Sequence, residues 1–69
     1  MRLSFAGIQE LETAVHVNSR HFSALKNLAV LYQKAGFRNK AIETWERALA
    51  VAPDEGTKKQ IKEHILGLL

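Results

Sequence analysis

The sequence predicts a single all-α domain, and three observations lead to this fold class. Its apolar residues recur at spacings of three and four, as they do along one face of an α-helix. No stretch alternates strictly between apolar and polar residues, and β-branched residues are sparse, so a sheet is not expected. With 69 residues, the chain has room for one small domain only.

Four apolar stripes predict four helices, at about 4–18, 22–35, 38–52 and 55–68. In chain order, the stripes consist of Ile8, Leu11, Ala14 and Val15; Leu25, Leu28, Tyr32 and Ala35; Ala41, Ile42, Trp45, Ala48 and Leu49; and Ile61, Ile65 and Leu68. Because the connections between them are short, neighbouring helices should run antiparallel.

The breaks between the stripes hold residues that begin or end helices. Ser19 is expected to cap the second helix, since it lies in a run of poor helix formers at residues 18–21. Gly36 suits a left-handed residue just past the end of that helix. Pro53 cannot continue the third helix, and Asp54 and Glu55 favour the positive end of the fourth.

The chain repeats itself after 34 residues. At this offset, six positions of the first helix match the third in size: Gly7 with Ala41, Ile8 with Ile42, Leu11 with Trp45, Ala14 with Ala48, Val15 with Leu49, and Val17 with Val51. Small residues thus meet small ones and large residues meet large ones. A period of this length predicts an array of helix pairs that pack in the same way.

The middle of the chain carries a specific set of small and bulky residues: Leu25, Leu28, Ala29, Tyr32, Ala41, Trp45, Ala48 and Pro53. With this set, residues 22–53 closely resemble one complete tetratricopeptide repeat (TPR). Two positions depart from the family pattern, which prefers Trp in place of Leu25 and places an aromatic residue one position after Phe37.

The resemblance implies a single TPR-like domain over residues 1–69, an antiparallel helix-turn-helix stack with the right-handed twist of an α-α superhelix. In this arrangement residues 4–18 correspond to the second helix of a preceding repeat. Residues 55–68, with a polar outer side, correspond to a capping helix.

The resemblance further implies a protein–protein interaction module, a scaffold or adaptor that binds a peptide or helical segment in a concave groove lined by the first helices of the repeats. The groove then maps to Ser23, Lys26, Val30, Gln33 and Lys34, with Lys59, Glu63 and Leu66 from the last helix. Its lysines would attract an acidic partner. A carboxylate clamp of the kind found in one TPR subgroup is not expected, because Val30 stands where that subgroup has Asn.

The first helix raises an alternative function, structural self-assembly. Without a helix before it, one apolar flank of this segment would lie bare, and homo-oligomerisation or domain swapping would cover it. The residues of that flank are Leu3, Phe5, Ile8 and Leu11. The oligomeric state distinguishes this alternative from a groove binder that stays monomeric.

No motif predicts an enzyme, a cofactor or a metal site. No Ser or Thr has a His and a carboxylate at a spacing that one helix or turn could align, and no Gly-rich loop follows a strand. The chain has no Cys. Glu12, His16 and His21 are the best candidate metal ligands, but their spacing matches no known signature. His64, beside Glu63, is interpreted as a surface residue.

Charge and hydropathy narrow the choice of partners. The net charge of +3, from 10 basic and 7 acidic residues, is too small to predict nucleic-acid binding. No segment approaches the ~20 apolar residues of a membrane span. We see no targeting signal and favour the cytoplasm. The expected partner is a protein or peptide with acidic character.

Overall fold

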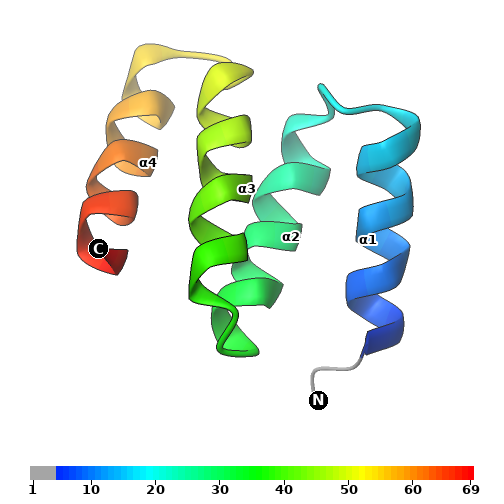
Figure 1. The fold of residues 1–69 in the computed structure, drawn as a ribbon. Helices are drawn as coiled ribbons and strands as arrows, with labels where there is room; N and C mark the ends of the chain where they lie inside the picture. Colours follow the sequence, from blue (N-terminus) through cyan, green and yellow to red (C-terminus); the bar gives the residue numbers. More distant parts are fainter. Residues whose placement is uncertain (1–4) are drawn as a thin grey trace.

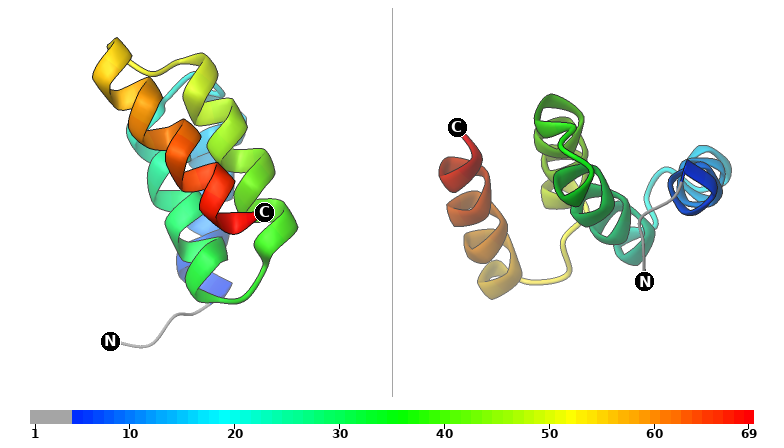
Figure 2. Two further views of the ribbon diagram at one scale, coloured as in Figure 1. Left: turned by 90° about the vertical axis from the view of Figure 1, so that its left-hand side faces the viewer. Right: turned by 90° about the horizontal axis from the view of Figure 1, so that it is seen from below.

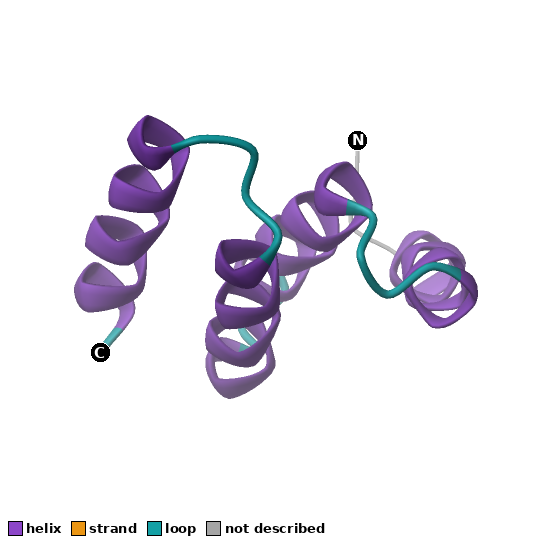
Figure 3. Cartoon of the chain, turned by 90° about the horizontal axis from the view of Figure 1, so that it is seen from above, coloured by secondary structure: helices purple, strands orange, loops and turns teal. Residues whose placement is uncertain are grey.

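The molecule consists of four helices joined by short loops (Figure 1). The computed structural model describes residues 5–69, with side chains from residue 7 onward. The helices are α1 (Phe5–Val17), α2 (Phe22–Lys34), α3 (Arg38–Ala50) and α4 (Glu55–Leu68). The part of the chain that is described contains no strand (Figure 3), which confirms the all-α class. No helix end differs from its expected position by more than about two residues.

The backbone of each helix lies closest to its neighbours in the sequence. The backbones of α1 and α2, of α2 and α3, and of α3 and α4 lie side by side, and within residues 5–69 no other pair of helices comes as close. Seen from below, the helices follow one another in a row (Figure 2, right). The two central helices therefore have partners on both sides, whereas α1 and α4 each have one. No helix in the described range is long and apolar enough to cross a membrane.

The core runs through α2 and α3. Three of its alanines, Ala29, Ala41 and Ala48, are completely buried. Small residues at these positions allow helix axes to approach closely. The bulky Tyr32 and Trp45, each only 6% exposed, fill the space on either side of the alanines.

The cap of α2 corrects one expectation. His21, not Ser19, is the capping residue, and its Nδ1 accepts a hydrogen bond from the Ala24 N–H at 3.1 Å. The reason is a turn that precedes the helix, in which the Asn18 side chain accepts from the Arg20 N–H at 3.2 Å. Ser19 lies within this turn, two residues before the cap, and so outside the capping position.

The end of α2 and the start of α4 are formed as expected. Gly36 has a φ of 87°, in the left-handed region that suits glycine. Asp54 caps α4 by accepting a hydrogen bond from the Thr57 N–H at 2.7 Å. This bond holds the pKa of the Asp54 carboxyl below its usual value.

We predict that Ala48→Leu destabilises the protein by about 1–3 kcal/mol, because a larger side chain overfills the contact between helices. Ala50→Leu is the matched control, since Ala50 is exposed on the same helix. It should change the free energy of unfolding by less than about 0.5 kcal/mol. Urea denaturation followed by circular dichroism measures both, and equal effects of the two substitutions would contradict the packing argument.

Candidate functional site

A groove lies between α2 and α4, and a residue of α3 lines it as well. Its larger part has a volume of about 270 Å³ and is lined by Phe22, Lys26, Trp45, Thr57, Gln60, Ile61 and His64. Its smaller part, of about 190 Å³, is lined by Val30, Gln33, Lys34 and His64. Since His64 lines both parts, we treat them as one surface and call it the α2–α4 groove.

The helical repeat explains how these residues come together. Phe22, Lys26 and Val30 are four residues apart, so they follow one edge of α2. Ile61 and His64 lie on the edge of α4 that faces α2. Trp45, from α3, lies between the two edges and forms the floor.

A polar contact at the centre of the groove joins three helices. Gln33 Oε1 accepts a hydrogen bond from Trp45 Nε1–H at 3.2 Å, and it lies 2.7 Å from His64 Nε2. Because an amide oxygen can only accept, His64 must carry a proton on Nε2. The His64 ring also packs on Trp45, with ring centroids 4.8 Å apart and planes inclined by 60°. Gln33 therefore links α2 to both α3 and α4.

The groove has a positive lining. Lys26 and Lys34 stand along it, and its lining residues include no carboxylate. Among the side chains of residues 7–69, the single ion pair joins Lys58 to Glu55 at 3.8 Å, away from the groove lining. Both lysines of the groove are thus left to interact with a ligand or with water.

The structure brings together half of the groove residues expected from the sequence. Lys26, Val30, Gln33 and Lys34 line the groove. On α4 the lining residues are instead Thr57, Gln60, Ile61 and His64. Ser23, Lys59, Glu63 and Leu66 are exposed but outside this lining.

The difference on α4 has a geometric cause. The expected residues of α4 are those that match the groove residues of α2 in the repeat, such as Lys59 for Lys26 and Glu63 for Val30. However, α2 and α4 are parallel helices on opposite sides of the groove, so they line it with opposite edges. His64 was missed because its contact with Gln33 spans 31 residues and leaves no local signal.

The residues expected for self-association are placed differently from one another. Ile8 is only 5% exposed and belongs to the core, so it does not form a bare flank in the single chain. Leu11 is half-buried against the same core. Leu3 and the side chain of Phe5 lie outside the described part of the chain.

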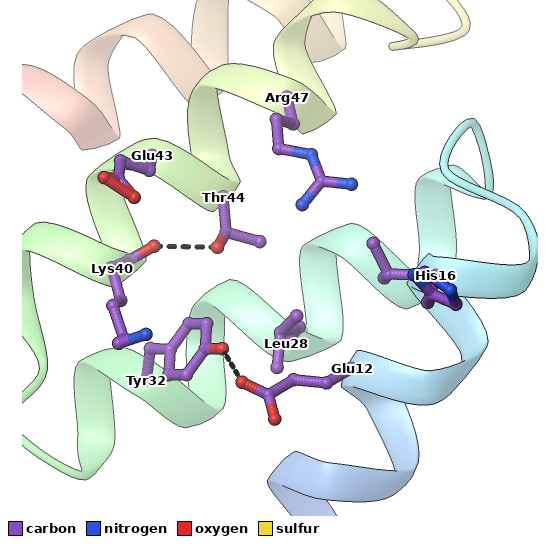
Figure 4. Close-up of a pocket in the computed structure, with 9 residues that line it drawn as sticks. Glu12, His16, Leu28, Tyr32, Lys40, Glu43, Thr44 and Arg47 are labelled. Carbon is purple, nitrogen blue, oxygen red and sulfur yellow. Dashed lines mark hydrogen bonds between the residues drawn. The ribbon is translucent and has the colours of Figure 1, made fainter.

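A second hollow, of about 330 Å³, lies on the opposite side of α2, between α1 and α3 (Figure 4). Glu12 and His16 line it from α1, and Lys40, Glu43 and Arg47 line it from α3. Cations and carboxylates are mixed on its walls, so it does not favour one sign of charge. Across the described residues, no group of three His, Asp or Glu is placed to hold a metal ion.

Tyr32 forms the floor of this second hollow and joins α1 to α2. Its hydroxyl donates a hydrogen bond to the Glu12 carboxylate, and Lys40 Nζ lies 5.8 Å from the centre of its ring. The ring edge of Tyr32 also meets Phe37, with centroids 6.2 Å apart. Burial, followed by the Glu12 hydrogen bond and charge, raises the pKa of Tyr32 to about 12.

Comparison of the chain with known protein families, curated proteins and solved structures finds no significant match.

We predict that Tyr32→Phe lowers the free energy of unfolding by about 1 kcal/mol, because it removes the hydrogen bond to Glu12. Glu12→Gln should cost less, since the amide oxygen can still accept from the hydroxyl. Denaturant unfolding at neutral pH measures both. A Tyr32→Phe protein as stable as the native one would show that this contact does not support the fold.

The raised pKa of Tyr32 predicts a specific pH dependence. Folding favours the protonated hydroxyl, so its contribution is complete below the ordinary tyrosine value of 10.0 and is lost as the pH rises towards about 12. The stability difference between the native protein and Tyr32→Phe should therefore shrink between these two values. A difference that stays constant over this range would contradict the assignment.

Proposed function

We propose that this chain is a protein-interaction module of the TPR type, which binds an extended acidic segment of a partner protein in the α2–α4 groove. The observation that carries the proposal is the pairing of an apolar floor with unpaired cations. Phe22 and Val30 supply half-buried apolar surface beside the buried Trp45 and Ile61, and Lys26 and Lys34 supply the charge. The 34-residue repeat and the signature residues of 22–53 support the family assignment.

The arrangement suits a segment in which acidic and apolar residues alternate. An extended strand directs successive side chains to opposite sides, and every second residue lies on the same side. Apolar side chains of the segment would enter the groove towards Trp45 and Val30. Its carboxylates would meet Lys26 and Lys34 at the rim, where charges mainly control the rate of association and its dependence on salt.

We predict that a fluorescently labelled peptide of alternating Glu and Leu binds this protein, and that a peptide of alternating Lys and Leu does not. Lys26→Glu combined with Lys34→Glu should weaken binding of the acidic peptide by about tenfold or more, because two attractions become repulsions. Fluorescence anisotropy measures the affinity. Added salt should weaken binding to the native protein as well.

Arg20→Glu combined with Arg38→Glu is the matched control. Both arginines are exposed and outside the groove lining, and the change in net charge is the same. Binding should depend on the position of the charges and not on their total. If both double variants bind the acidic peptide equally well, the groove is not the binding site.

A further inference from the structure

A histidine stands at the centre of the α2–α4 groove. His64 lines both parts of the groove, and the residue is exposed, so that a proton and a ligand both reach it. Its Nε2 lies 2.7 Å from Gln33 Oε1, and its ring centroid lies 4.8 Å from that of Trp45. Histidine is the side chain whose charge ordinarily changes between about pH 5 and 8. The groove thus contains a group that couples its charge to the acidity of the solution.

The contacts of His64 are compatible with a charged ring. Gln33 Oε1 accepts from the Nε2–H group, and this donor is present in the neutral and in the charged form. The second proton goes to Nδ1, to which no other group of residues 7–69 forms a hydrogen bond. The ring also lies within the ~6 Å over which an indole attracts a cation. Protonation therefore adds charge to the groove without removing a contact that shapes it.

The charged groups that face His64 are all cations. Lys26 and Lys34 share the groove lining with it, both from α2. The third helix contributes only Trp45 to the lining, and the other lining residues of α4 are uncharged. Glu63, the neighbour of His64 in the chain, is exposed and outside the lining. A charged His64 is thus a third cation in a groove without a carboxylate, and a ligand has to supply the opposite charge.

We propose that His64 sets the selectivity of the groove for acidic segments, because it takes up a proton and joins Lys26 and Lys34 as a third positive charge. This inference rests on the function proposed above and makes that function dependent on pH. A carboxylate bound beside His64 favours the charged ring. Since coupling between two ligands is reciprocal, a proton on His64 favours the binding of the carboxylate to the same extent.

The other titratable groups do not produce the same effect. Glutamates of a peptide ligand stay ionised above about pH 5.5, and lysines stay charged below about pH 8. Any loss of carboxylate charge on acidification would weaken binding instead of strengthening it. The two other histidines of the chain, His16 and His21, lie outside the groove lining. Tighter binding of an acidic segment at lower pH is therefore the specific sign of a charged His64.

Fluorescence anisotropy at two pH values tests the proposal, with the peptide of alternating Glu and Leu and a rhodamine label that is insensitive to pH in this range. The native protein should bind about fivefold more tightly at about pH 5.5 than at about pH 8, which corresponds to one favourable ion pair. His64→Gln keeps an N–H group for Gln33 but carries no charge, so its affinity should be the same at both values. His64→Arg is always charged and should bind tightly at both.

Two controls match this experiment. His16→Gln removes a histidine that is exposed and outside the groove lining, so this variant should keep the full dependence on pH. A peptide of alternating Gln and Leu has no carboxylate side chains, so it should gain no affinity on acidification. Circular dichroism at both pH values verifies that each variant is folded.

Trp45 reports the charge of His64 without any ligand. It is the single tryptophan of the chain, and its ring packs against that of His64. A charged imidazole ring accepts an electron from an excited indole more readily than a neutral one does, so it quenches the fluorescence more strongly. The emission of Trp45 should therefore fall between about pH 8 and 5.5, and it should stay nearly constant in His64→Gln.

Three results would overturn the proposal. One is an acidic peptide that binds equally tightly at both pH values. Another is a gain of affinity on acidification that His64→Gln retains. The third is an emission of Trp45 that depends on pH in the same way with and without His64. Each of them leaves the proposed function standing if the peptide binds at neutral pH through Lys26 and Lys34, whereas a lack of binding at either pH would overturn both proposals.

Discussion

The close packing of helices around three alanines of α2 and α3, Ala29, Ala41 and Ala48, is the constraint on which the rest of the structure depends. All three alanines are completely buried, and their small size lets the helices approach closely. The large aromatic residues must then lie beside this contact and not within it. Trp45 consequently forms the floor of the α2–α4 groove, and Tyr32 forms the floor of the hollow on the other side. One packing arrangement thus shapes both concave surfaces.

The terminal helices depend on polar contacts more than the central pair does. The backbone of each lies beside one other helix only, so each buries less apolar surface against the core, and one hydrogen bond is a larger part of what holds it. Tyr32 ties α1 to the core through Glu12, and Gln33 ties α4 through His64. Both ties come from α2, which therefore fixes the position of its neighbours and the width of the two hollows.

The sequence predicts those features that depend on residues close together in the chain. Helix positions, the left-handed Gly36 and the Asp54 cap follow from periodicity and local chemistry. The α2 half of the groove also follows, because one edge of one helix is a local pattern. The Gln33–His64 contact does not, since it joins residues 31 positions apart. The residues of α4 that line the groove differ from the expected ones, because the repeat indicates equivalent positions, whereas a groove is lined by opposite edges.

This distinction between equivalent and opposing edges also explains which residues of α4 are left outside the groove. Each of the two helices beside the groove has two edges. One edge lines the groove, and the other faces away from it. In α4 the edge with Thr57, Gln60 and His64 faces the groove, and the edge with Lys62 and Leu66 faces away.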